Sequence, residues 1–159
     1  MNQKTQSKSS TLGAKLKKAV QHLQVDVFGY EPKVTKNVLT YFSELSRTTK
    51  IPKERLFLRM FDDGESVRTV VYYQGRLIKR ISVKELITIF TGVPLHMESQ
   101  VTHKMQAFMQ EVATKHHITK TELQLCIVTD REKVWVRAYD RTRFLTVVPL
   151  KELVKHFIG

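Results

Sequence analysis

Residues 56–67 read Leu-Phe-Leu-Arg-Met-Phe-Asp-Asp-Gly-Glu-Ser-Val, and residues 123–134 read Leu-Gln-Leu-Cys-Ile-Val-Thr-Asp-Arg-Glu-Lys-Val. In both stretches an apolar residue recurs at every second position until an acidic turn, after which a valine opens a second run. A period of two predicts a strand with one buried face, and the turn predicts a hairpin onto the next strand. Because the two stretches lie 67 positions apart, they indicate a repeated unit.

The repeat covers most of the chain. Residues 34–92 align with residues 101–159 without a gap, and 17 of the 59 pairs are identical, from Val34/Val101 to Gly92/Gly159. Ordinary residue usage gives about three or four identities in such an alignment. Two copies are too few for a solenoid or a propeller. We therefore interpret the chain as an internal duplication, the single-chain version of a twofold dimer.

Each copy is predicted to contain the same five elements. Apolar residues at steps of three and four predict a first helix over 35–48 and 102–115. Three strands follow, at about 55–61, 66–73 and 76–81 in the first copy and at 122–128, 133–140 and 143–148 in the second. A short helix over 86–90 and 153–157 closes each copy, and Ser82 and Glu85 form a capping box before the first of these.

The predicted fold class is therefore α+β, with an α-β-β-β-α unit present twice. The two three-stranded antiparallel sheets, each backed by helices, either fuse edge to edge into one six-stranded sheet or pack face to face. The polar residues 1–10 are predicted to be a disordered tail, and residues 11–33 a basic amphipathic helix followed by a connector at 29–32. Residues 34–92 and 101–159 are the repeats, and residues 93–100 link them.

The element order of each copy resembles that of the double-stranded RNA-binding domain, and a tandem fused sheet resembles the construction of TATA-binding proteins. In the first of these families, a run of Lys and Ala begins the last helix and contacts phosphate. Here residues 83–86 and 150–153 offer one Lys beside one Glu instead. Since fold topology alone does not establish function, we infer no family membership from this order.

The charge balance is the clearest indication from composition. The 159 residues carry a formal net charge of +12, which is typical of a protein that binds a polyanion. A solvated cationic surface, an anionic membrane surface and an acidic protein partner remain alternatives. No run of residues is long and apolar enough to predict a membrane span. Cys126 is the only cysteine, which favours a reducing compartment and a cytoplasmic location.

Motifs for catalysis or metal binding are weak. The sequence has no glycine-rich phosphate loop, no His-Glu-x-x-His and no Cys-x-x-Cys. Its acidic pairs, Asp62/Asp63 and Asp130/Glu132, fall in predicted turns, where Asp is favoured for its turn geometry. We therefore predict a protein without catalytic residues, without a metal site and without a cofactor.

The sheet face opposite the helices is the strongest candidate site. If Leu56, Leu58 and Met60 point toward the helices, the alternate residues point away from them. That second face then carries Phe57, Arg59, Phe61, Arg68, Val70 and Tyr72 in the first copy and Gln124, Cys126, Val128, Trp135, Arg137 and Tyr139 in the second. Arginines interleaved with aromatic rings suit nucleic acid, because bases stack on rings and phosphates meet the positive charge.

The leading functional prediction is a non-catalytic protein that binds nucleic acid, DNA or RNA, with little sequence specificity. The residues predicted to contact it are Lys15, Lys17, Lys18, Arg59, Arg68, Arg76, Trp135, Arg137, Tyr139 and Arg143. The alternative is a protein–protein assembly module. A face with so many apolar residues favours burial under the N-terminal helix, under the other copy of the unit or against a second chain in a homodimer.

Overall fold

The computed structural model describes residues 30–158, which form four α-helices, one 3-10 turn and a sheet of six strands. The helices are α2 (Tyr30–Thr49), α3 (Val83–Thr91), α4 (Glu98–Lys115) and α5 (Leu150–Ile158), and the 3-10 turn is η1 (Lys53–Arg55). The strands are β1 (Phe57–Asp62), β2 (Val67–Tyr73), β3 (Arg76–Ile81), β4 (Leu123–Asp130), β5 (Lys133–Asp140) and β6 (Arg143–Val148).

All six strands belong to one antiparallel sheet in the order β3-β2-β1-β4-β5-β6. The two three-stranded halves thus meet edge to edge through β1 and β4, which decides between the two arrangements left open by the sequence. At this junction Arg59 lies directly opposite Cys126, its equivalent at the 67-residue offset. The antiparallel pairing is therefore symmetric about that one pair of residues.

The pairing inside the two halves also agrees position by position. Thr69 pairs with Ile81 and Val136 with Val148, at the same offset. Each half has one register shift, between Val71 and Tyr72 in the first and between Ala138 and Tyr139 in the second. The two halves therefore share an element order, a register and the position of a β-bulge.

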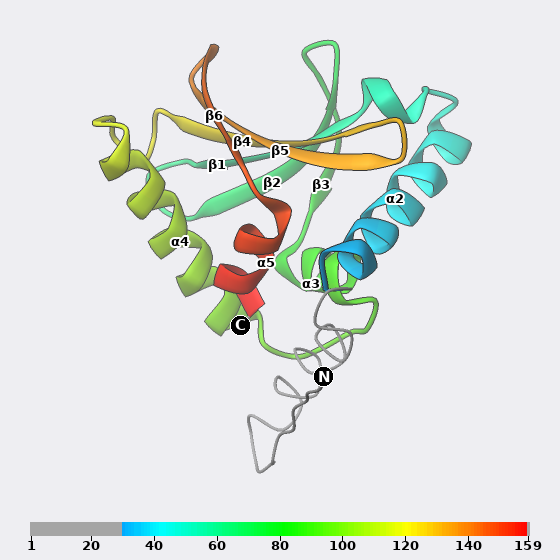
Figure 1. The fold of residues 1–159 in the computed structure, drawn as a ribbon, viewed down its shortest axis with the longest axis horizontal. Coiled ribbons are helices and arrows are strands. Elements are labelled where there is room, and N and C mark those ends of the chain that lie inside the picture. Colours follow the sequence, from blue (N-terminus) through cyan, green and yellow to red (C-terminus); the bar gives the residue numbers. More distant parts are fainter. Residues whose placement is uncertain (1–29, 159) are drawn as a thin grey trace.

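The helices all lie on one side of the sheet (Figure 1). Helix α2 packs against α3 and α5 and reaches β5 in the other half, while α4 packs against α5 and α3 and reaches β2. Each long helix therefore crosses onto the strands of the opposite half. The result is one continuous hydrophobic core containing residues from both halves. A domain of about 60 residues buries only about 60% of the surface that its unfolded chain exposes, so either half alone would be marginally stable.

The predicted strand faces agree with the observed burial. Leu56, Leu58, Leu123 and Leu125 are each 0% exposed and lie in the core between the sheet and the helices.

Of the capping box predicted at the start of α3, the structure has the Ser82 hydrogen bond but not the Glu85 one. The Ser82 hydroxyl accepts a hydrogen bond from the Glu85 amide at 3.0 Å, but the Glu85 carboxylate pairs with Lys79 at 2.7 Å.

Both long helices begin earlier than predicted. Helix α2 starts at Tyr30 rather than at residue 35, so the predicted connector at 29–32 is helical from its second residue. Its third residue is Pro32, and proline is compatible with a first helical turn because the amide there has no intrahelical partner. Helix α4 starts at Glu98, within the predicted linker, after Met97. Because Met97 provides no side-chain cap, the sequence contained no marker for this start.

Candidate functional site

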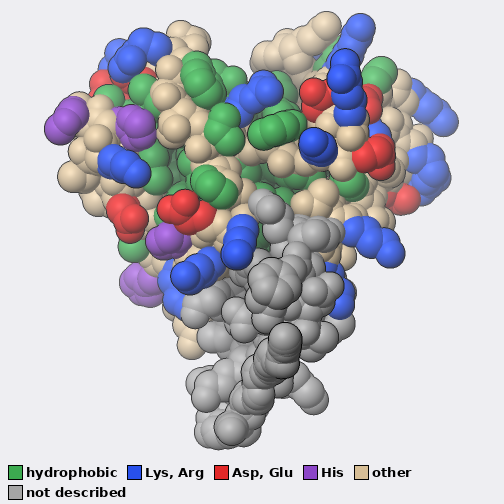
Figure 2. Space-filling model, viewed as in Figure 1, with side chains coloured by type: hydrophobic (Ala, Val, Ile, Leu, Met, Phe, Trp, Pro, Cys, Tyr) green, Lys and Arg blue, Asp and Glu red, His purple; other side chains and the backbone are tan. Residues whose placement is uncertain are grey.

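The sheet face turned away from the helices, called here the open face, is the largest candidate site. By strand register it consists of sixteen side chains: Phe57, Arg59, Phe61, Arg68, Val70, Tyr72, Leu77, Arg80, Gln124, Cys126, Val128, Trp135, Arg137, Tyr139, Phe144 and Val147. The β2–β3 and β5–β6 hairpins rise beside this face, away from the helices (Figure 1). In Figure 2, hydrophobic and basic side chains lie next to one another over the strands.

Arg59 occupies the centre of the open face and is held firmly there. Its Nε donates a hydrogen bond to Oε1 of Gln124, across the β1–β4 junction. Its guanidinium lies 4.9 Å from the ring centre of Tyr72 and 5.8 Å from that of Phe61. Cation–π contacts of this kind stabilise a fixed orientation. Arg59 is therefore a positioned positive charge on an aromatic platform.

Cys126 lies opposite Arg59, and its thiol is a poor nucleophile at neutral pH. Burial raises the pKa of its thiol to about 11, although the nearby Arg59 and Arg137 act in the opposite direction. A thiol with such a pKa is protonated at neutral pH, and the thiolate is the nucleophilic form. Cys126 thus has the character of a packing residue.

The arginines of the open face differ in whether an acid neutralises them. Arg68 binds Asp63, with 2.7 Å between Nε and Oδ2, and the backbone and guanidinium hydrogen bonds to that carboxylate hold the pKa of Asp63 well below its usual range. Within residues 30–158, Arg59, Arg80 and Arg137 form no ion pair. None of the sixteen open-face side chains is a carboxylate, so the face is positively charged.

The structure brings together five of the ten residues predicted to contact nucleic acid. Arg59, Arg68, Trp135, Arg137 and Tyr139 all lie on the open face. Lys15, Lys17 and Lys18 lie outside the described residues.

Arg76 and Arg143, which the sequence also predicted to contact nucleic acid, do not lie on the open face. They pair with Tyr73 and Asp140 at the hairpins and, by alternation, lie on the helix side of the sheet. Arg143 also binds the Asp140 carboxylate at 3.1 Å.

Four residues of the open face were not predicted from the sequence, namely Leu77, Arg80, Phe144 and Val147. Simple alternation back from the buried Ile81 would place Leu77 in the core. The bulge beside Tyr72 changes the phase of β3, so that Leu77 pairs with Tyr72 on the open face. The adjacent apolar pairs Leu77-Ile78 and Phe144-Leu145 were the available indication, because strict alternation cannot bury two neighbours.

Apolar side chains on this face are unusually exposed. Trp135 is 37%, Leu77 41%, Val147 43% and Phe144 51% exposed. Phe144 meets the ring of Tyr139 edge to face, with 5.8 Å between ring centres. Contiguous exposed apolar groups are typical of a surface that meets a partner.

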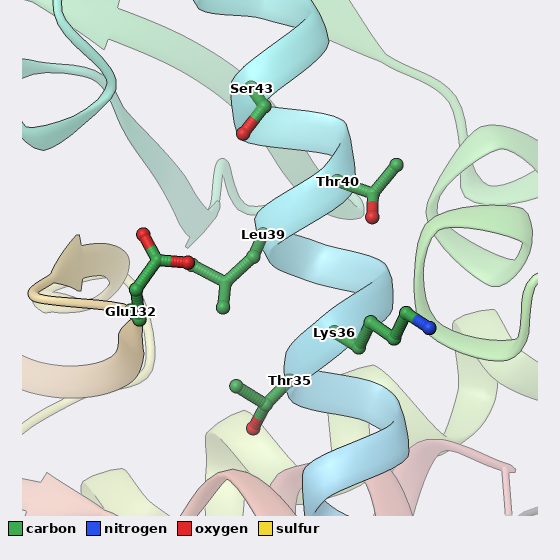
Figure 3. Close-up of a pocket in the computed structure, with 6 residues that line it drawn as sticks. All are labelled: Thr35, Lys36, Leu39, Thr40, Ser43 and Glu132. Atoms are coloured by element: carbon green, nitrogen blue, oxygen red, sulfur yellow. The ribbon is translucent and has the colours of Figure 1, made fainter.

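One cavity borders the open face, and another lies beside α2 on the helix side of the sheet. A groove of about 830 Å³ starts from Phe61, Arg68 and Arg80 and continues past the start of α3. The other, of about 490 Å³, lies between α2 and Glu132 of the β4–β5 turn. Figure 3 shows that Lys36 and Thr40 point away from Glu132 and Leu39 toward it, so its polar groups do not converge. The second cavity thus has no arrangement suited to a specific ligand.

No family model, no curated protein and no solved structure matches this chain. Among residues 30–158, no three His, Cys, Asp or Glu side chains come together as a group that could hold a metal ion. None of the helices in that range combines the length and hydrophobicity of a membrane span.

Proposed function

We propose that this protein is a non-catalytic, cytoplasmic binding protein whose open face binds nucleic acid with little sequence specificity. The observation that carries the proposal is the composition of that face. Four arginines and several aromatic rings share it with no carboxylate among its sixteen side chains. Phosphates are attracted to such a field regardless of base sequence.

The arrangement of the arginines supports this proposal. Arg59 is oriented by Gln124 and Tyr72, so little side-chain entropy would be lost when it meets a ligand. Arg80 and Arg137 have no acidic partner within residues 30–158, and they flank Arg59 in the same cross-strand row. An arginine without a carboxylate partner can give all its donors to phosphate or stack on a base.

Binding of a labelled oligonucleotide at two salt concentrations tests the proposal. We expect affinity that falls steeply as salt rises, because each phosphate contact releases counterions. Arg137→Ala should weaken binding, whereas Arg143→Ala should leave it nearly unchanged, since Arg143 is paired with Asp140 away from the face. No measurable binding by the parent protein at low salt would overturn the proposal.

The exposed apolar residues favour one other function, assembly through the same face. Phe144 and Val147 are 51% and 43% exposed, and two such faces would bury each other in a twofold dimer. The solution mass distinguishes the two functions. A dimer indifferent to nucleic acid would identify an assembly module, and a monomer with salt-sensitive binding would identify the nucleic-acid function.

We further propose that the two halves arose by duplication of one unit. The shared register, the bulges at equivalent positions and the self-equivalent pair Arg59/Cys126 support this origin. A twofold homodimer of single units would have paired one strand with its own copy in the same way. Fusing two units places both halves of the core in one chain.

A further inference from the structure

The two halves of the open face have diverged in opposite directions. At the 67-residue offset, Arg68 corresponds to Trp135, and Arg80 corresponds to Val147. The first half thus has basic residues at two positions where the second half has exposed apolar ones. Val70 and Arg137 are the one reversed pair. We call the open face of β2 and β3, with Arg68 and Arg80, the basic half, and that of β5 and β6, with one arginine, the apolar half.

The apolar half has the geometry of a stacking surface. Trp135, Arg137 and Tyr139 follow one another on the same side of β5 at steps of about 7 Å, the length of two residues in a strand. Phe144 extends this surface from β6, with its ring edge-on to Tyr139. Bases stack on aromatic rings and on guanidinium planes, and they do so with little regard to sequence.

Only unpaired bases have faces available for such stacking. In a duplex each base is covered by its neighbours, and extruding one requires that it be unstacked and unpaired. Exposure of 37% for Trp135 and 51% for Phe144 leaves ring area free to meet a base. The chemistry of this half therefore fits a single strand better than a duplex.

The basic half has the features of a phosphate track. Arg68 and Arg80 line the groove of about 830 Å³, together with the hydroxyl residues Ser66, Thr69 and Ser82. The groove also contains two acids, Asp63 and Glu85, but each is already paired, with Arg68 and Lys79 respectively. Within residues 30–158, Arg80 has no such partner and keeps its full charge for a ligand.

We propose that the open face binds single-stranded nucleic acid with its two halves in different roles. Trp135, Phe144 and Tyr139 stack unpaired bases, while Arg80, beside the Asp63-paired Arg68, holds the phosphates of the same strand. This inference rests on the proposed function and adds to it the class of ligand and the direction in which the strand lies, across the sheet from β6 toward β3.

The chain itself provides the reporter, because Trp135 is its only tryptophan. Its fluorescence is followed while the full-length protein is titrated with a ten-nucleotide oligothymidylate, a duplex of equal length and heparin. Binding of each is measured separately through its own label. We expect the single strand to quench Trp135 emission and to bind more tightly than the duplex, and heparin to bind without quenching.

Matched variants at equivalent positions separate the two halves. Phe144→Ala should lower the affinity for the single strand about tenfold and change the affinity for the duplex little. Leu77→Ala removes an exposed apolar side chain at the equivalent position of the basic half and should weaken binding of the single strand much less than Phe144→Ala does. Arg80→Ala should weaken the oligonucleotide and heparin alike while Trp135 is still quenched at saturation. Trp135→Phe should retain most of the affinity, since stacking needs a ring rather than an indole.

The outcomes distinguish this inference from the function on which it rests. Equal affinity for single strand and duplex, with unchanged Trp135 emission, would overturn the stacking role and leave nucleic-acid binding intact. Equal loss in Phe144→Ala and Leu77→Ala would overturn the division between the halves. If the protein binds none of the nucleic acids, the proposed function itself is wrong.

Discussion

At the scale of single residues, the centre of the open face shows how burial sets reactivity. Cys126 faces two arginines, which on charge alone would favour its thiolate, yet burial is the larger influence and raises the pKa to about 11. We expect iodoacetamide at pH 8 to modify Cys126 about a hundredfold more slowly than an ordinary exposed thiol, because the thiolate fraction is that much smaller.

The rate of this modification should rise about tenfold per pH unit until the pH approaches 11. The same protein unfolded in urea, in which the thiol is hydrated, should react at the ordinary rate and serves as the control. A rate that levels off between pH 8 and 9 in the folded protein would contradict the effect of burial. Burial raises the pKa of the thiol because it disfavours the charged form of an acid.

Individual core residues were predictable from the sequence, whereas individual contacts were not. The alternation of Leu56, Leu58 and Met60 was sufficient to place them in the core. Nothing in the sequence indicated that Arg59 would meet Gln124, 65 positions away, because that contact depends on the register between β1 and β4. The sequence thus predicted which face Arg59 occupies without predicting its partners.

At the scale of elements, the strand faces can be tested by one substitution. Leu58 is 0% exposed, in the middle of β1. Leu58→Ala should lower the free energy of unfolding by about 2–5 kcal/mol, the range for a buried leucine that leaves a cavity. Leu77→Ala is the control, since Leu77 is 41% exposed and should change the unfolding free energy by less than about 0.5 kcal/mol. Urea denaturation of both variants measures the difference.

Equal destabilisation by Leu58→Ala and Leu77→Ala would mean that the strand faces are misassigned.

The types and order of the elements could be predicted from the periodicity of apolar residues and from the turn residues. The helix starts at Tyr30 and Glu98 did not, because neither is preceded by a serine, threonine or aspartate cap. The bulges at Tyr72 and Tyr139 were also missed, since their one indication was a pair of adjacent apolar residues, Leu77-Ile78 and Phe144-Leu145.

At the scale of the whole molecule, the way in which the halves join was not predictable from the repeat alone. Equal halves can fuse at an edge or stack face to face, and the apolar alternation within each half fits both arrangements. The composition of the strands did indicate which strands lie at the centre of the sheet and which lies at an edge. β1 and β4 have apolar residues on both faces, whereas β3 exposes Lys79 and Arg80, and charged residues are typical of strands at the edge of a sheet.

The charge of the whole chain includes the predicted basic segment that precedes the described residues. Replacing Lys15, Lys17 and Lys18 with Gln removes three positive charges and leaves Leu12, Leu16 and Leu23 in place. If these lysines meet phosphates, affinity should fall alike for every oligonucleotide sequence. The slope of log affinity against log salt should shrink by about two to three units. An unchanged slope would show that the segment does not contact the nucleic acid.

The register between β1 and β4, where the two halves join, can be tested with an engineered disulfide. Arg59 and Cys126 are direct cross-strand partners, and such pairs have Cα atoms about 4.5–5.5 Å apart, within the range that a disulfide spans. The Arg59→Cys protein should therefore lose both free thiols under mild oxidation while remaining monomeric, as a thiol assay and the solution mass would show. Phe61→Cys is the control, because Phe61 faces Gln124 and lies diagonally, about 7–8 Å, from Cys126.

The Phe61→Cys protein should keep two free thiols under the same oxidation. Linkage in Phe61→Cys but not in Arg59→Cys would mean that β1 and β4 pair two residues out of the observed register. The self-equivalent pair at the centre of the molecule would then be Met60 and Ile127, which are also 67 positions apart. Linkage in Arg59→Cys alone would locate the pseudo-twofold axis at one pair of residues, since every other cross-strand pair of this junction joins positions that are not equivalent.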